Sequence, residues 1–150
     1  MDKSITAIVK PTHECNLACR YCYVEDSAEQ GRMDSKTLEN MVNQLTSLPN
    51  IERIHIIWHG GEPLMMGIDF YKQAVEIQRR FTDKRFENSV QTNATLITPE
   101  VLDFCEQYNF HIGSSMDGPQ EIHDLTRVYP DGRGSFQDVW RGIQSIRKRN

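Results

Sequence analysis

Three of the chain's four cysteines lie within eight residues, as Cys15, Cys19 and Cys22 of the segment CNLACRYC. Disulfide pairing does not explain an odd number of thiols at such short spacing, so the group favours a metal site. Polar neighbours such as Asn16 count against a buried apolar stripe. Three thiolates suit a four-iron four-sulfur cluster in which one iron has no protein ligand. A Cys3His zinc site, with His13 as the fourth ligand, is the alternative that these residues leave open.

Three further segments combine turn residues with polar side chains, and each lies at the end of a predicted strand. WHGGEP (58–63) contains a glycine pair, which lets the backbone approach a ligand closely. QTN (91–93) ends in an asparagine that suits either a turn or a ligand contact. SSMDGP (114–119) contains two serines and a turn. Each of these segments alone is explained by a turn, so their weight depends on whether they meet in space.

Hydrophobic periodicity predicts the elements that position these segments. Short β-branched runs predict strands, and amphipathic runs between them predict helices, the first with one face formed by Leu38, Met41, Leu45 and Leu48. Strands are expected at 5–9, 54–58, 86–92 and 110–116. Helices are expected from Asp34 or Ser35 to about 48, across 70–81, from Thr98 with Pro99 to about Tyr108, and from Ser135 onward.

This alternation predicts the α/β class, with four parallel strand–helix units joined by right-handed crossovers. The carboxyl ends of parallel strands share one edge of the sheet, where α/β folds bind their ligands. All four segments are therefore expected on the same rim. Four units leave the last strand with an open edge. Residues 1–150 are therefore expected to be the N-terminal portion of a larger core domain, or else to pair edges in a small oligomer.

Together these motifs resemble those of the radical S-adenosylmethionine (radical SAM) enzymes, in the expected order along the chain. CNLACRYC resembles the segment whose three cysteines hold the cluster, and WHGGEP resembles the GGE motif. VQTNATLI is similar to the end of the third strand, with Ala94 where glycine is more usual. SSMDGPQEIHDLTR resembles a segment of the sulfatase-maturing and peptide-maturing (SPASM-type) subgroup. The resemblance implies a partial (β/α) barrel, about four units of a six-unit radical SAM barrel.

The resemblance also implies roles for individual residues. Cys15, Cys19 and Cys22 are implied to hold a [4Fe-4S] cluster, and Tyr21 is implied to lie beside the adenine of S-adenosylmethionine. By the resemblance, Gly60, Gly61 and Glu62 contact the methionine ammonium. Asn93 is implied to contact the ribose or methionine portion. Ser115 and Arg127 are implied to bind the methionine carboxylate.

Several side chains near these motifs have structural explanations. His123 and Asp124 are expected to cap or brace their loop, and no residue is identified as a catalytic acid or base. Cys105 lies on the apolar face of a predicted helix, so we expect it to be a small buried hydrophobe.

The implied activity is reductive cleavage of S-adenosylmethionine to a 5′-deoxyadenosyl radical, which abstracts hydrogen from a peptide or protein, as in RiPP-type peptide maturation. An anaerobic sulfatase maturase, which forms formylglycine, is the alternative. His59 stands where glutamine is expected in sulfatase maturases, which favours a peptide-modifying enzyme. A small-molecule substrate and a non-catalytic zinc-binding module are further possibilities. Ferredoxin or flavodoxin is expected as the electron donor.

Composition limits the partners and the compartment. The 150 residues are 38% hydrophobic and 25% charged, which is typical of one globular domain. The formal net charge of −4 argues against nucleic acid as a partner. No apolar run is long enough to cross a membrane, and the N-terminal segment does not resemble a signal peptide. We therefore expect a cytoplasmic protein that binds neither nucleic acid nor membrane.

Overall fold

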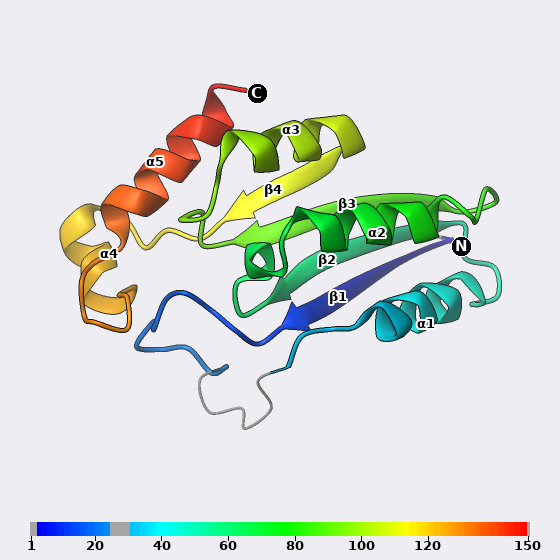
Figure 1. Cartoon of the computed structure of the whole chain (residues 1–150), viewed down its shortest axis with the longest axis horizontal. Helices are drawn as coiled ribbons and strands as arrows, with labels where there is room; N and C mark the ends of the chain where they lie inside the picture. Colours follow the sequence, from blue (N-terminus) through cyan, green and yellow to red (C-terminus); the bar gives the residue numbers. More distant parts are fainter. Residues whose placement is uncertain (1–2, 25–30, 150) are drawn as a thin grey trace.

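The computed structural model describes residues 3–24 and 31–149, and within them it forms one sheet of four parallel strands. The strands lie in sequence order and are β1 (Ser4–Thr12), β2 (Arg53–Gly60), β3 (Arg85–Thr92) and β4 (Phe110–Ser114). Each predicted strand is confirmed, although β4 is two residues shorter than expected. All four carboxyl ends point the same way, so the segments that follow them meet at one edge (Figure 1).

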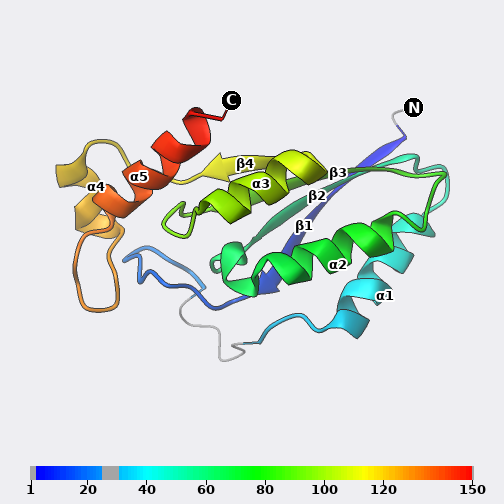
Figure 2. The same cartoon turned by 45° about the horizontal axis from the view of Figure 1, so that its top comes forward.

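Three helices connect the strands and cover one face of the sheet, as both views show (Figures 1 and 2). They are α1 (Ser35–Thr46), α2 (Ile68–Gln78) and α3 (Pro99–Tyr108). A short 3-10 helix, η1 (Pro63–Met66), follows β2, while α4 (Gln120–Thr126) and α5 (Phe136–Arg147) follow β4 beyond the carboxyl edge. No helix in the described part of the chain is long and apolar enough to span a bilayer.

The helix ends follow the capping residues of the sequence. Asp34 is the N-cap of α1, and its carboxylate accepts a hydrogen bond from the Thr37 amide at 2.7 Å. The Thr98 hydroxyl caps α3 by accepting from the Val101 amide at 3.3 Å, with Pro99 at the first helical position. Of the two caps considered for α1, the structure selects Asp34.

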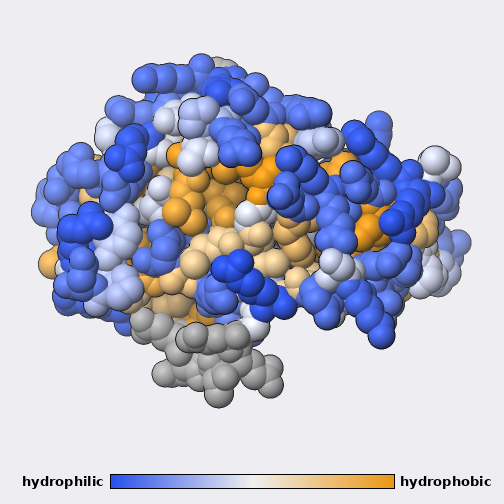
Figure 3. Space-filling view, viewed as in Figure 1, coloured by the Kyte–Doolittle hydropathy of each residue, from blue (hydrophilic) through white to orange (hydrophobic). Residues whose placement is uncertain are grey.

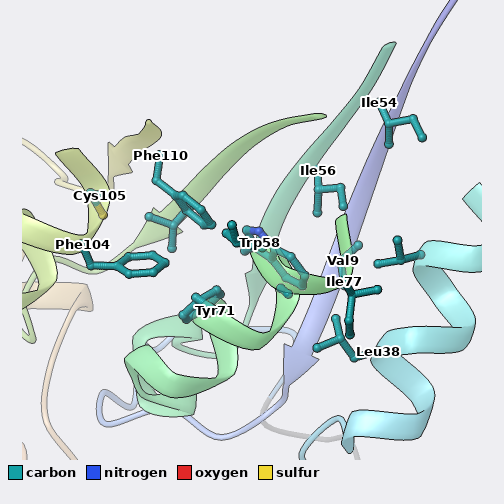
Figure 4. Packing of buried hydrophobic residues seen from close by; sticks show 14 of the residues in the cluster. Val9, Leu38, Ile54, Ile56, Trp58, Tyr71, Ile77, Phe104, Cys105 and Phe110 are labelled. Carbon is teal, nitrogen blue, oxygen red and sulfur yellow. The ribbon is translucent and has the colours of Figure 1, made fainter. Parts of the chain in front are cut away.

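The core lies between the sheet and these helices, with Trp58 at its centre (Figure 4). Alternate residues of β2 point to the helix side, so Ile54, Ile56 and Trp58 are completely buried. The indole of Trp58 makes edge-to-face contacts with Phe70 and Tyr71, at centroid distances of 5.7 and 5.6 Å. Trp58 is therefore fixed in the core two residues before the glycine pair begins at Gly60.

Polar atoms within this core satisfy one another. The Trp58 Nε1–H donates to Asn88 Oδ1 at 3.0 Å, and Asn88 exchanges hydrogen bonds of 2.9 and 3.1 Å with Gln78. Because unsatisfied buried amides are costly, this pairing joins α2 to β3 in a single register. Cys105 is buried as expected, with 5% of its surface exposed.

Three details differ from the expected elements. Helix α4 was not predicted from the sequence. Its apolar residues Ile122 and Leu125 are more than half exposed, so this short helix has no buried apolar stripe that the sequence pattern could reveal. Leu48 and Phe81 lie beyond the ends of α1 and α2, so neither extends the helical face assigned to it. The fully buried residue that this reasoning missed on α1 is Val42.

Candidate cofactor site

The segments that follow the four strands line one pocket at the carboxyl edge of the sheet. The predicted convergence on one rim is therefore confirmed. The pocket walls contain the three clustered cysteines, every predicted cofactor contact and a few neighbours; its lining residues include Cys15, Cys19, Tyr21, Cys22, His59, Gly60, Gly61, Glu62, Gln91, Asn93, Ser115 and Arg127. Residues more than 100 positions apart in the chain thus share a single cavity.

A separate hollow lies on the helix-covered face, between α2 and α3. Figure 3 shows hydrophobic residues gathered in the middle of this face and framed by hydrophilic ones. Leu64, Ile68, Val101 and Phe104 are among the residues that line it, and none of the three clustered cysteines does. The three clustered cysteines therefore line the rim pocket and not this hollow.

All four cysteines of the chain are free thiols. Partial burial raises the pKa of Cys15 and Cys19, because it disfavours the thiolate, while the nearby Arg127 charge opposes this rise at Cys19. Thiols in this condition need a strong positive charge beside them to ionise, and metal ions provide it. The electrostatics of the pocket are therefore compatible with thiols that become anionic on binding metal.

The described residues do not form a compact site for one metal ion. Across positions 3–24 and 31–149, no three histidine, cysteine or acidic side chains converge as ligands of a single ion do. Zinc needs its four donors within bonding distance of one centre. Each thiolate of a four-iron cluster binds a different iron, so its thiolates stand farther apart. The described residues therefore give no support to the Cys3His zinc site, and a four-iron cluster does not require its thiolates to converge on one ion.

Backbone hydrogen bonds hold the cysteine segment against the chain that follows α4. The amide of Ala18 donates to the Val128 carbonyl at 2.7 Å, and the amide of Arg20 donates to the Thr126 carbonyl at 2.9 Å. Sequence reasoning missed this pairing, because the partners are more than 100 residues apart and neither shows a distinctive residue type.

A side-chain cluster of Tyr21, Asp117 and Arg127 reinforces that contact. The Tyr21 hydroxyl donates to Asp117 Oδ2 at 2.6 Å, and Arg127 Nε forms an ion pair with Asp117 Oδ1 at 3.0 Å. Burial and the bond to Asp117 raise the pKa of Tyr21 to about 12, so the phenol stays neutral. Burial alone would raise the pKa of Asp117, but bonds from Tyr21 and Arg127 prevail and lower it. Asp117, expected only as a turn residue, therefore orients two predicted cofactor contacts.

The glycine pair is required by a close backbone approach. A Cβ at Gly61 would lie 2.1 Å from the Glu14 carbonyl oxygen, and one at Gly60, where φ is +113°, would lie 2.5 Å from the Thr12 oxygen. The Gly61 amide also donates to the Thr12 carbonyl at 3.0 Å. The partner of this close approach is the segment that leads into the cysteines, whereas the approach expected from the sequence was to a ligand, which stays a prediction.

Glu62 is a buried carboxylate that joins the ends of β2 and β3. Only 1% of its surface is exposed. It accepts hydrogen bonds from the Thr92 hydroxyl and the Asn93 amide, both at 2.7 Å, and from the Leu64 amide at 3.0 Å. Burial raises its pKa, although these three donors act in the opposite direction. The carboxylate thus lines the pocket while its two oxygens hold neighbouring backbone in place.

Asn93 joins the cysteine segment to the end of β3. Its Nδ2 donates to Asn16 Oδ1 at 2.9 Å, and its Oδ1 accepts from the Thr95 hydroxyl at 2.7 Å. Asn16 Nδ2 in turn donates to the Thr95 hydroxyl at 2.8 Å, which closes a three-residue ring. Sequence reasoning identified Asn93 but missed Asn16 and Thr95. A polar residue between cysteines was the only available signal.

His123 and Asp124 brace the loop, as expected. His123 is fully buried, accepts from the Asp117 amide at 3.3 Å and contacts the Ser135 hydroxyl at 3.0 Å. Asp124 accepts from the Phe136 amide at 2.9 Å at the start of α5. Ser135 Oγ donates its own proton to the Arg127 carbonyl, so it accepts a hydrogen bond from the Nε2–H of His123. The Nδ1 atom of His123 accepts from the Asp117 amide, so the imidazole is neutral.

A partial parallel α/β barrel with a thiol-lined pocket at its carboxyl edge defines the class of protein. Residues 9–150 match the model of the Radical SAM superfamily, and the chain belongs to that family. Membership implies a [4Fe-4S] cluster and S-adenosylmethionine as cofactors. The three thiols, together with the Arg127 cation and the Ser115 hydroxyl on the same pocket, fit the two groups.

The chain is similar to anaerobic sulfatase-maturating enzymes. It is 37% identical to the serine-type enzyme of Bacteroides thetaiotaomicron, over 97% of this chain and 37% of the relative. It is 33% identical to the cysteine-type enzyme of Clostridium perfringens, over 96% of this chain and 41% of the relative. The solved structure of native anSMEcpe with bound AdoMet and Cp18Cys peptide superimposes with a TM-score of 0.86 at 34% identity, covering 95% of this chain and 40% of that one. The chain therefore spans about two fifths of the length of these relatives.

Proposed function

We propose that residues 1–150 form the cofactor-binding part of a radical SAM core domain, in an enzyme that modifies a peptide or protein. The observation that carries this proposal is the pocket in which the cysteine segment meets the ends of all four strands. Family membership supports the cofactors, and the relatives support the kind of substrate.

In this proposal, Cys15, Cys19 and Cys22 hold the cluster. When bound, the cluster and S-adenosylmethionine supply reductive cleavage to a 5′-deoxyadenosyl radical, which abstracts hydrogen from the substrate. The chain's own residues bind and orient these groups. The Gly61 amide bonds the Thr12 carbonyl and the Glu62 amide bonds the Glu14 carbonyl, which holds the segment just before Cys15 against the end of β2.

Arg127 and Ser115 bind the methionine carboxylate. The guanidinium offers paired N–H donors to two oxygens, and its ion pair with Asp117, 3.0 Å from Nε to Oδ1, holds it at the pocket. Ser115 accepts a hydrogen bond from the Gln91 amide at 3.0 Å, which leaves its own hydroxyl proton for the ligand. Gly60, Gly61 and Glu62 face the methionine ammonium, where carbonyl oxygens and a carboxylate favour a cation.

Tyr21 lies beside the adenine and remains neutral. Its hydroxyl bond to Asp117 and the Arg127 guanidinium 5.5 Å from its ring centroid hold the ring at the pocket wall. A neutral, fixed ring favours stacking on a nucleobase and excludes water from that side.

The substrate is a peptide or protein. Peptide maturation of the RiPP type is our first candidate, and formation of formylglycine in a sulfatase is the second. The second candidate is favoured by the relatives, which are sulfatase-maturating enzymes, whereas His59 in the pocket favours the first. A cytoplasmic enzyme that receives electrons from ferredoxin or flavodoxin fits the free thiols, which persist in reducing compartments.

Anaerobic reconstitution with iron and sulfide tests the proposal. We expect a brown protein with about four irons per chain, which forms 5′-deoxyadenosine from S-adenosylmethionine on reduction. The triple Cys15→Ala, Cys19→Ala, Cys22→Ala variant should bind no cluster, whereas Cys105→Ala serves as the matched control and should bind it fully. A colourless wild-type protein, or one that binds a single zinc and no sulfide, would refute the proposal.

A further inference from the structure

Asn93 has one N–H that is directed at a cysteine sulfur. The side chain is only 7% exposed, and its Oδ1 accepts from both the amide and the hydroxyl of Thr95, at 3.0 and 2.7 Å. One Nδ2 hydrogen bonds Asn16 at 2.9 Å, and the same nitrogen lies 3.9 Å from Cys15 Sγ. A side-chain amide has two N–H donors and one acceptor oxygen, so these contacts use every hydrogen-bonding group of the Asn93 side chain.

The sulfur of Cys15 therefore receives two N–H groups. The Leu17 amide lies 3.4 Å from it, in addition to the Asn93 side chain. Hydrogen bonds to cluster sulfurs are among the factors that set the reduction potential of an iron–sulfur cluster. Both donors come from backbone or from a side chain that its neighbours fix, so they are present before any ligand binds.

We propose that Asn93 tunes the cluster: its Nδ2–H donates to the Cys15 thiolate and raises the reduction potential. This inference rests on the proposed function, since it requires Cys15 to be a cluster ligand. Reduction adds one electron, from the external ferredoxin or flavodoxin, to a cluster that is already anionic with its thiolates. A donor at the sulfur stabilises the more negative, reduced form more than the oxidised form. Removing the donor therefore makes the cluster harder to reduce.

The position of Asn93 supports this role over a contact to the nucleoside. Its backbone amide is bonded to Glu62 at 2.7 Å, and its side chain is bonded to Asn16, inside the cysteine segment. The asparagine is thus fixed at both ends to the structure that presents Cys15. Its remaining N–H points to the sulfur rather than to the open part of the pocket.

A redox titration of the reconstituted protein, followed by electron paramagnetic resonance without S-adenosylmethionine, tests the inference. In Asn93→Ala the potential should become more negative by up to about 59 mV, which is a tenfold change in a one-electron equilibrium. Asn93→Asp should move it further, because it adds a negative charge beside the sulfur. The affinity for S-adenosylmethionine, measured by equilibrium binding to the oxidised protein, is compared in the same variants, because it separates donation to the sulfur from a contact to the cofactor.

Two further variants separate donation from loop order. Asn93→Ser keeps an acceptor for the Thr95 amide but replaces the Nδ2–H near the sulfur with a shorter hydroxyl, so it should match Asn93→Ala even if the alanine variant assembles poorly. Thr95→Val loosens the ring but keeps the Asn93 donor, so its potential should remain close to that of wild type.

The results that overturn the inference differ from those that overturn the proposed function. A wild-type potential in Asn93→Ser, or an equal shift in Thr95→Val, excludes donation by Asn93. A weaker affinity for S-adenosylmethionine with an unchanged potential assigns Asn93 to the cofactor instead. Failure of the wild-type protein to assemble any cluster refutes the proposed function itself.

Discussion

The helix-covered face of the sheet and the rim at its carboxyl edge are built on different principles. Trp58 and Gly61 illustrate the contrast, because they are only three residues apart. Trp58 is held in place by packing against apolar and aromatic neighbours. At position 61, by contrast, only glycine fits, because a Cβ would lie 2.1 Å from a carbonyl oxygen. The core therefore depends on volume, and the rim depends on single polar contacts between distant segments.

The largest expected effect comes from emptying the core. Trp58→Ala should lower the free energy of unfolding by about 4 kcal/mol, since it leaves a cavity and removes a donor from Asn88. Ile8→Ala is the matched control on the uncovered face of the sheet, where Ile8 is 67% exposed; its effect should stay below about 0.5 kcal/mol. Urea denaturation measures both. Equal losses would show that the two faces do not differ.

At the rim, we expect substitutions to lower the free energy of unfolding by overpacking instead of by cavity formation. Gly61→Ala should cost about 3 kcal/mol, because its methyl group collides with backbone that has no side chain to move aside. It should also reduce the iron and sulfide bound on reconstitution. Gly31→Ala is the same chemical change at a position where no atom of the described residues lies within 4 Å of the added Cβ, and it should leave both measurements unchanged. A stable, fully loaded Gly61→Ala protein would contradict the close approach.

A smaller effect is expected from a single buried oxygen. Glu62→Gln places an amide NH2 against the Asn93 amide, so two donors face each other at a cost of about 2 kcal/mol. Glu87→Gln, an exposed residue 3.9 Å from Arg53, should cost under about 1 kcal/mol. Thermal unfolding at neutral pH compares the two. If Glu62→Gln were neutral, the site would hold the protonated acid, in the direction in which burial shifts its pKa.

The smallest effect concerns pH at the cluster of Tyr21, Asp117 and Arg127. The pKa of Asp117 is lowered from its ordinary value of 3.8, so the carboxylate stabilises the folded state above that pH. This stability should disappear as the pH falls from about 3.8 through the folded-state pKa. Asp117→Asn should therefore be less stable than wild type at pH 6, and the gap should narrow below pH 4 in melting experiments. A gap that is constant with pH would exclude a charged role for Asp117.

Local sequence determined the strands, four of the five α-helices in the described residues, and the common rim. β-branched runs, the Asp34 and Thr98 caps and the glycine pair act over a few residues, so spacing alone reveals them. The three cysteines were equally visible, because thiol clusters have few structural explanations. Helix α4 was not visible, because its apolar residues stay exposed and give no periodic stripe.

Only the tertiary structure decided which polar groups meet within the pocket. The bond between Asn16 and Asn93 joins residues 77 positions apart, and that between Tyr21 and Asp117 joins residues 96 apart. Each of these side chains is also an ordinary turn or surface residue, so its local sequence does not distinguish the two roles. Hydrogen bonds need distances and angles that are set when the sheet brings its strand ends together, and spacing along the chain does not encode them.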